Sequence, residues 1–271
     1  MFDQDMAQKA AENLRRVRER RPLVHNITNY VVMNYTANAL LACGASPVMA
    51  HAFEEVEEMV ALAGALVLNI GTLSRPWIEA MVKAGRRANA LNIPVILDPV
   101  GAGATRLRTD TAQRLIKEVS IQVIRGNASE ILSLAGAESG PSTKGVDSVH
   151  TVDQAVATAM MLAKELRTTL AITGVEDWIT DGRRIYKVRN GHALMAQVTG
   201  TGCTATAIIG AFLAVTPDPL EAASTALAYF GLAGEKAAVQ TLGPGSFQIA
   251  LLDALYLMQG EDLRSGAKIQ R

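Results

Sequence analysis

Short apolar runs alternate with longer amphipathic stretches along most of the chain. The runs SPVMA, ALVLNIG, IPVILDPVG, IQVIRGN and TLAITG have the length of buried strands, and helical stretches separate most of them. Before them, the pattern predicts a helix over residues 5–20, a short strand in LVHNITN and a helix over 30–42 that Gly44 closes. This alternation predicts an α/β protein whose mainly parallel sheet is covered by helices on both faces.

Polar or turn-forming residues follow four of the predicted strands. They occupy residues 69–71, 98–101, 125–127 and 173–174. In open parallel sheets the ligand crevice lies beyond the carboxyl ends of the strands. We therefore expect these four segments to converge on one rim of the sheet and to form the site.

The second half of the chain departs from this alternation. DWITDGRRIYKVRN places the turn Asp181-Gly182 between two runs of strand character, which predicts a hairpin at a sheet edge, antiparallel to the other strands. From Gly200 onward the pattern predicts helices rich in Ala and Gly. No repeat, low-complexity tract or linker interrupts the sequence, so we expect one domain over residues 1–271.

Composition and charge narrow the class of protein. Of the 271 residues 49% are hydrophobic and 19% are charged, which is typical of a globular chain, and 26 basic residues balance 26 acidic ones. Such a balance argues against nucleic acid or an anionic membrane surface as a partner. The N-terminal 22 residues lack an apolar export segment, and no run approaches the roughly 20 apolar residues of a membrane span, so we expect a soluble, unprocessed protein.

The chain has two cysteines, Cys43 and Cys203. Two residues at this separation fit neither a disulfide scaffold nor the paired spacing of a zinc or iron-sulfur site. A reducing cytoplasmic location is the expectation that follows.

The glycine-rich turn Gly200-Thr201-Gly202-Cys203 is the sharpest local signal. It precedes an apolar helix, and the free amides of a helix start, aided by the helix dipole, bind anions. Glycines before a helix also serve close packing, so the turn alone favours neither interpretation.

The segment NASE, residues 127–130, follows the apolar run IQVI and Arg125. An amide and a carboxylate at a strand-to-helix junction can hold the water shell of Mg²⁺, and Arg125 would then face a phosphate. Alternatively, Asn127 caps the helix and Glu130 is its capping-box partner. The two roles are compatible.

Asp98 ends the predicted strand IPVIL and precedes a glycine-containing loop. Its carboxylate is placed either to interact with a hydrated metal ion or to form the turn, and the pattern does not decide between them. The chain contains no GxxxxGK[ST] motif, and no GxGxxG follows the first strand, which excludes a standard P-loop enzyme and a dinucleotide fold.

Taken together, the motifs NITN, DPVGAG, RGNASE, ITG and VTGTGC, in this order between Pro22 and Leu257, resemble the hydroxyethylthiazole kinase family of the ribokinase-like superfamily. The resemblance implies a three-layer α/β/α fold. It also implies Mg²⁺- and ATP-dependent phosphorylation of the hydroxyl of 4-methyl-5-(2-hydroxyethyl)thiazole, a reaction of thiamine salvage.

Cys203 stands where the wider superfamily carries the aspartate of a GxGD motif, which acts as base for the accepting hydroxyl. The same replacement marks the thiazole kinase branch. A helix start favours the thiolate and an incoming polyphosphate disfavours it, so we expect Cys203 to be a poor base. A weak base is tolerated in phosphoryl transfer, which depends mainly on positioning and charge stabilisation. A covalent cysteine intermediate is disfavoured, and a small buried apolar Cys is the structural alternative.

The resemblance also implies roles for further residues. Met49 and Gly200 would contact the thiazole, together with Asn26 and Gly71, although Met49 could equally be core packing. The remaining assignments place Arg125, Thr173 and Asn127 on ATP, Asp98 and Glu130 on Mg²⁺ through water, and the catalytic turn at Gly200, Thr201, Gly202 and Cys203. Family members are trimers with the substrate pocket at a subunit interface, so a homotrimer is implied.

Two other functions stay open at this point. One is a ribokinase-like kinase acting on a hydroxymethylpyrimidine or a sugar, against which Cys203 argues. The other is a protein that binds nucleotide or thiazole without turnover, which would be stabilised by ligand but release no ADP.

Overall fold

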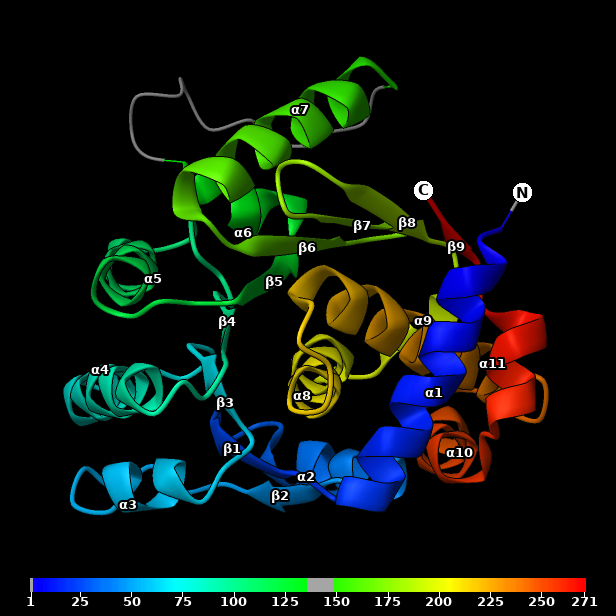
Figure 1. Cartoon of the computed structure of the whole chain (residues 1–271), viewed down its shortest axis with the longest axis horizontal. Helices are drawn as coiled ribbons and strands as arrows, with labels where there is room; N and C mark the ends of the chain where they lie inside the picture. The colour runs from blue at the N-terminus through cyan, green and yellow to red at the C-terminus, as the bar shows by residue number, and fades with distance from the viewer. Residues whose placement is uncertain (1, 136–148) are drawn as a thin grey trace.

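A computed structural model describes residues 2–135 and 149–271, with the backbone alone for 149–155. Within this part of the chain the strands form one nine-stranded sheet in the order β2-β1-β3-β4-β5-β6-β7-β8-β9 (Figure 1). The strands are β1 (Leu23–Ile27), β2 (Ser46–Val48), β3 (Ala65–Asn69), β4 (Val95–Asp98), β5 (Val123–Asn127), β6 (Thr169–Thr173), β7 (Asp177–Thr180), β8 (Ile185–Val188) and β9 (Ile269–Gln270).

The strands from β2 to β6 are parallel, and those from β6 to β9 are antiparallel. The register aligns the polar strand ends with one another, since Asn69 pairs with Asp98 and Asn127 pairs with Thr173. The predicted rim at the carboxyl ends of β3 to β6 is thereby confirmed.

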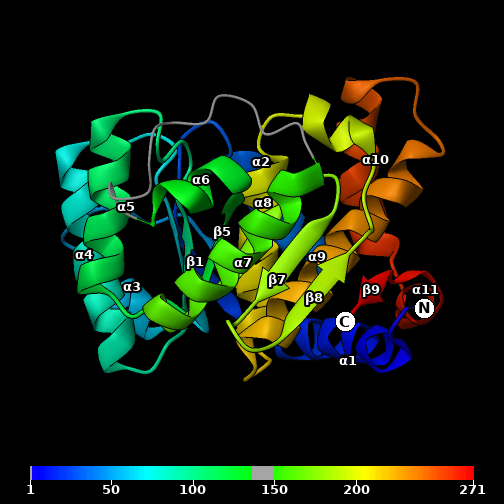
Figure 2. The same cartoon turned by 90° about the horizontal axis from the view of Figure 1, so that it is seen from above.

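Helices cover both faces of this sheet, so the three-layer α/β fold is also confirmed (Figures 1 and 2). One face carries α1, α2, α8, α9 and α10, and the other carries α3 to α7. The helices are α1 (Gln4–Arg20), α2 (Met33–Cys43), α3 (Val56–Ala61), α4 (Arg75–Ala90), α5 (Arg106–Glu118), α6 (Ala128–Ser133), α7 (Val149–Leu166), α8 (Thr201–Leu213), α9 (Pro219–Ala238), α10 (Pro244–Leu257) and α11 (Gly260–Gly266), with a 3₁₀ helix, η1, at Ala193–Gln197.

Helix α8 is apolar around its whole circumference because it lies between the sheet and the outer helices. Its residues 204 to 213 are all buried, and Gly210 leaves room for Val24 and Val67 of the sheet to approach its backbone. This packing fixes the position of the turn from which α8 begins.

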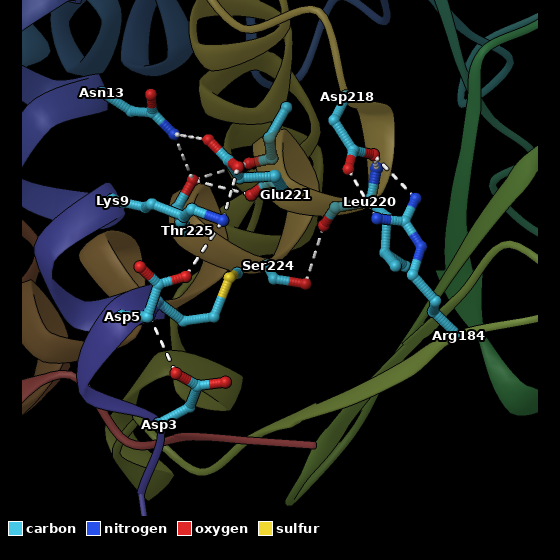
Figure 3. Close-up of polar contacts among 12 residues, drawn as sticks. Asp3, Asp5, Lys9, Asn13, Arg184, Asp218, Leu220, Glu221, Ser224 and Thr225 are labelled. Atoms are coloured by element: carbon cyan, nitrogen blue, oxygen red, sulfur yellow. Dashed lines mark hydrogen bonds and ion pairs between the residues drawn. The ribbon is translucent and has the colours of Figure 1, made fainter.

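Polar contacts attach α1 to α9 at the edge of this apolar layer (Figure 3). The side-chain amide of Asn13, which is buried, donates to Glu221 and to Thr225 at 3.2 Å each, and Lys9 forms an ion pair with Glu221 at 3.4 Å. Since a buried amide is stable only when hydrogen-bonded, these contacts specify how the first helix docks.

Three details differ from the sequence-based expectations. The second helix begins at Met33, not residue 30, because residues 29–32 form a turn closed by Val32 N–H to Asn29 O at 3.3 Å. The hairpin of β7 and β8 is not the sheet edge, since Ile269 of β9 pairs with Val188. Strand β9 and helix α11 were not predicted. None of the described helices is long and apolar enough to cross a membrane.

Candidate functional site

The glycine-rich turn begins α8 beside the rim of the sheet. Gly200 caps the helix with a φ of 91°, in the left-handed region, and a Cβ at this position would stand 2.6 Å from Val32 Cγ1. Thr201 donates its hydroxyl to Met195 O at 2.8 Å and Val198 O at 3.2 Å, which ties the turn to η1. The turn is thus held from both sides in one conformation.

Arg125 lies directly against this turn. A Cβ built on Gly202 would stand 2.7 Å from Arg125 Nη1, so the guanidinium reaches this place only because residue 202 has no side chain. The other end of the guanidinium donates to the hydroxyl of Thr173, at the end of the neighbouring strand β6. The structure therefore brings together three predicted site residues from β5, β6 and α8.

The turn and Arg125 form a positive pole. Gly202 and Cys203 occupy the second and third positions of α8, where a helix supplies no carbonyl partner, and their amides donate to no acceptor among the described residues. Free amides, the helix dipole and a guanidinium at one place are the groups that bind phosphate oxygens.

Glu130 joins the loop after β4 to the start of α6. One carboxylate oxygen accepts from Gly101 N–H at 2.8 Å and the other accepts from Asn127 N–H at 2.8 Å, while Asn127 Oδ1 accepts from Glu130 N–H at 2.9 Å. The capping box that the sequence offered as the alternative is therefore present. Each carboxylate oxygen keeps a further lone pair for a water on a metal ion.

Asp98 is buried at the end of β4, with only 1% of its surface exposed. Its Oδ2 accepts from Asn69 Nδ2 at 2.9 Å and from Thr206 Oγ1 at 2.8 Å, whereas Oδ1 has no partner. Burial raises the pKa of Asp98 to about 6, and the nearby charge of Arg125 opposes this rise. The unpartnered Oδ1 is itself buried, so a water molecule that enters this cluster would be needed to link it to a cation.

Cys203 points toward the same buried polar cluster. Its Sγ accepts from Asn29 Nδ2 at 3.4 Å, and burial, together with the negative charge of Asp98, raises the pKa of the thiol to about 11. Burial thus outweighs the groups that lower the pKa, and the thiol is protonated at neutral pH. Asn29 and Thr206 were missed as site residues, although Thr206 lies one helical turn after Cys203. Asn69 belongs to a strand end that was expected at the site, but no role was predicted for it.

A cavity of about 620 Å³ opens on the Arg125 side of the turn. Arg125, Thr173 and Asn127 line one end of it, and Leu227 and Phe230 of α9 line an apolar part. A cavity with phosphate-binding groups at one end and apolar walls at the other matches a nucleotide in size and chemistry.

The four residues expected on the thiazole lie elsewhere. The last pair between β1 and β2 is His25 with Val48, and Asn26 and Met49 follow these two residues. The cavity is lined by none of the four residues Met49, Asn26, Gly71 and Gly200. Asn26 is fully buried, and its amide donates to Val24 O at 2.9 Å. Met49, Gly71 and Gly200 are half-buried and accessible from outside.

Among the described residues no group of three or more His, Cys, Asp or Glu side chains is placed to hold a metal ion directly. Mg²⁺ in nucleotide sites usually keeps several waters and takes one or two carboxylates, so Asp98 and Glu130 are a sufficient set for such an ion.

Comparison with known proteins identifies the family of this chain. The model of the hydroxyethylthiazole kinase family matches residues 14–261. The chain belongs to the hydroxyethylthiazole kinase family. A hydroxyethylthiazole kinase from Desulfotalea psychrophila is 63% identical over 96% of this chain and 95% of its own length, and one from Moorella thermoacetica is 54% identical over 97% and 98%.

Solved structures place the hydroxyethylthiazole kinase family among ribokinase-like folds. The structure of a hydroxyethylthiazole kinase protein from Pyrococcus horikoshii matches with a TM-score of 0.89 at 50% identity and covers 96% of this chain and 98% of its own. Pyridoxal kinase from Staphylococcus aureus, in complex with AMP-PCP, matches with a TM-score of 0.59 at 17% identity over 79% of this chain and 88% of its own, a likeness in fold alone. The expected family and fold are confirmed, and the chain is a kinase.

Proposed function

We propose that this kinase transfers the γ-phosphoryl group of ATP to the hydroxyl of 4-methyl-5-(2-hydroxyethyl)thiazole, giving the thiazole phosphate used in thiamine salvage. The observation that carries the proposal is the contact between Arg125 and Gly202, which places a guanidinium beside the free helix amides of Gly202 and Cys203. Membership of the hydroxyethylthiazole kinase family supplies the acceptor. The proposal treats residues 1–271 as one kinase domain, which the single sheet supports.

In this proposal, Arg125, Thr173 and Asn127 bind the nucleotide in the cavity beside the turn. The amides of Gly202 and Cys203 stabilise the charge that develops on the transferred group, a role that fixed donors perform without reorganisation. Asp98 and Glu130 would hold Mg²⁺ through water, and the ion would neutralise the polyphosphate. Met49, Gly71 and Gly200 would contact the thiazole, with Asn26 behind them.

The proton of the accepting hydroxyl leaves late in such a reaction, because phosphoryl transfer proceeds through a loose transition state. A thiol whose pKa is about 11 is protonated before the reaction and cannot take the proton early. Cys203 is therefore assigned the role of orienting the hydroxyl, and the positive pole of the turn the role of stabilising the transition state.

A coupled ADP assay with ATP and Mg²⁺ tests the function, with the thiazole alcohol, a hydroxymethylpyrimidine and a sugar compared side by side. We expect ADP release to depend on the thiazole alcohol. Arg125→Ala, purified in the same way, is the control for contaminating kinases. Ligand-dependent stabilisation without ADP release would indicate a binding protein, and faster turnover of the pyrimidine or the sugar would reassign the substrate.

We further propose a homotrimer with the thiazole site at the subunit interface. Large apolar side chains are exposed on α10 and on the turn before α2, the helix against which α10 packs. They are Tyr30, Val31, Ile249, Tyr256 and Leu257, each about two thirds exposed. An exposed apolar surface of this kind is typical of a protein interface. A cytoplasmic location completes the proposal and agrees with the free thiols of Cys43 and Cys203.

Light scattering tests the trimer. We expect three times the chain mass of 28.8 kDa for the natural protein and a smaller mass for Ile249→Glu, with loss of thiazole-dependent activity. Leu62→Glu, at an equally exposed residue beyond the end of α3, is the matched control and should leave the mass unchanged. A monomeric natural protein with full activity would contradict the proposal.

A further inference from the structure

A chain of buried amides connects Cys203 to Asp98. Asn29 donates to Cys203 Sγ at 3.4 Å and to Asn69 Oδ1 at 2.9 Å, and Asn69 in turn donates to Asp98 Oδ2 at 2.9 Å. Asn29 is 4% exposed and Asn69 is 1% exposed. Both side chains are almost completely buried, so they act on the site through the groups to which they hydrogen-bond.

The direction of these hydrogen bonds is fixed at Asn69. Its Oδ1 accepts from the backbone N–H of Gly71 at 3.0 Å, and an N–H can only donate. Its Nδ2 faces the Asp98 carboxylate, which can only accept when ionised. A flipped amide would set donor against donor at Gly71 and oxygen against oxygen at Asp98, so this amide has one orientation.

Asn69 in turn fixes Asn29. Because Asn69 offers an oxygen, Asn29 must present its NH₂ group there, and the second N–H of that group is the one that meets Cys203 Sγ. Space for this amide exists because residue 71 is glycine: a Cβ on Gly71 would stand 2.6 Å from Asn29 Nδ2. The sulfur consequently receives a hydrogen bond from its buried side.

We propose that Asn29, oriented by Asn69, is a positioning residue for phosphoryl transfer, because it holds the side chain of residue 203 as a hydrogen-bond acceptor beside the accepting hydroxyl. The inference rests on the proposed function. Because the Asn29 amide donates to the buried side of the sulfur, the S–H group and the remaining lone pair are directed to the crevice. A carboxylate at residue 203 would receive the same hydrogen bond, so the amide suits either an aspartate or a cysteine at this position.

A double-mutant cycle between Asn29 and Cys203 tests the proposal on turnover. Asn29→Asp keeps the size of the side chain and removes the NH₂ group; even when protonated, the new carboxyl has one donor where Asn29 has two. We expect kcat to fall by about tenfold or more with the KM for ATP unchanged, and by less than about twofold when Cys203→Ala is already present. An equal loss in both backgrounds would show a merely structural role and overturn the proposal.

Alkylation of Cys203 tests the contact without turnover, so its result stays distinct from a failure of the proposed kinase activity. Cys43 is fully buried, which leaves Cys203 as the accessible thiol for iodoacetamide. At one fixed pH we expect Asn29→Asp to slow the alkylation by about tenfold, since the thiolate loses the Asn29 donor and keeps only the stabilising contact with Asn69. Asn38→Asp on the exposed side of α2 is the matched control and should leave the rate unchanged.

An alkylation rate in Asn29→Asp within about twofold of the natural rate would contradict the hydrogen bond to sulfur. Circular dichroism establishes that each variant is folded. If Asn29→Asp does not fold, Asn29→Ser serves instead, because its hydroxyl retains one donor in a smaller side chain. It should show the same dependence on Cys203 in the cycle, and a loss independent of Cys203 would again overturn the proposal.

Discussion

The guanidinium of Arg125 and the backbone of Gly202 occupy adjacent space, with 2.7 Å between Arg125 Nη1 and the point where a Cβ of residue 202 would stand. A contact this short leaves no room for even a methyl group. The nucleotide end of the site therefore depends on a glycine that makes no polar side-chain contact itself.

Gly202→Ala should displace the Arg125 guanidinium and weaken its contact with phosphate. We expect the KM for ATP to rise by about tenfold, with a smaller change in the KM for the thiazole alcohol. Steady-state kinetics with each substrate varied in turn checks this. Gly245→Ala is the matched control, because no atom lies within 4 Å of a Cβ there. Equal rises in the KM values for ATP and for the thiazole alcohol would show instead that Gly202→Ala disturbs the whole turn and not the Arg125 contact alone.

Cys203→Asp should keep or raise kcat, because a carboxylate is a better proton acceptor than a thiol whose pKa is about 11. The amide of Asn29 already points toward the new carboxylate. Steady-state kinetics at saturating ATP and thiazole alcohol measures the change. A fall in kcat by more than about 100-fold, with the fold intact, would instead assign a specific chemical role to the thiol.

Glu130→Gln should shift the Mg²⁺ requirement. The amide retains one acceptor for Gly101 or Asn127 but loses the charge, so we expect half-maximal activation at a several-fold higher Mg²⁺ concentration, with thiazole affinity unchanged. Loss of one capping contact should also lower the free energy of unfolding by about 1 kcal/mol. Glu54→Gln, at an exposed residue, is the control. An unchanged Mg²⁺ titration would leave Glu130 with the capping role alone.

Asp177 should make stability depend on pH in the acid range. Burial raises its pKa from 3.8 to about 6, although Gly174 N–H and the charge of Arg125 oppose the rise. Between pH 4 and 6 the native state thus binds more protons at this residue than the unfolded state, and its contribution to stability falls as pH rises through that window.

Urea unfolding at pH 4, 5 and 6 measures the effect. Asp177→Asn should reduce the loss of unfolding free energy between pH 4 and pH 6 by about 2 kcal/mol, since the amide cannot ionise and can still accept from Gly174 N–H. Asp110→Asn at an exposed residue of α5 is the control. A slope that Asp177→Asn leaves unchanged would assign the dependence to other carboxyl groups.

The sequence was sufficient to predict eight of the nine strands, a mainly parallel sheet and the rim. These depend on local patterns, since each apolar run ends at its own polar residue and parallel strands align those ends. The capping box of Asn127 and Glu130 was likewise readable, because its two partners lie three residues apart. The second helix began later than predicted because Asn29 and Val32 close a turn that the apolar pattern does not show.

The buried amide chain could not be predicted because its members come from separate parts of the sequence. Asn29 and Cys203 are 174 residues apart, and Asn69 and Asp98 are 29 apart. An asparagine in a sequence gives no sign of which groups will surround it once the strands are paired. Strand β9 was missed for a similar reason, since two residues, Ile269 and Gln270, are too short to show a period.

The burial of α8 has a consequence for the order in which the protein acquires its parts. Strand β2 lies on the outer side of β1, and β3 joins the other side of β1. From β4 onward each new strand joins beside the one made before it, so the sheet can grow strand by strand as the chain is synthesised. One face of β1, β3 and β4 nevertheless stays bare until residues 201–213 arrive to cover it. The segment that covers this face is also the one that begins with the reacting turn. A half-made chain therefore has strands and an exposed apolar face but no reacting turn, and the same segment supplies both the cover and the turn.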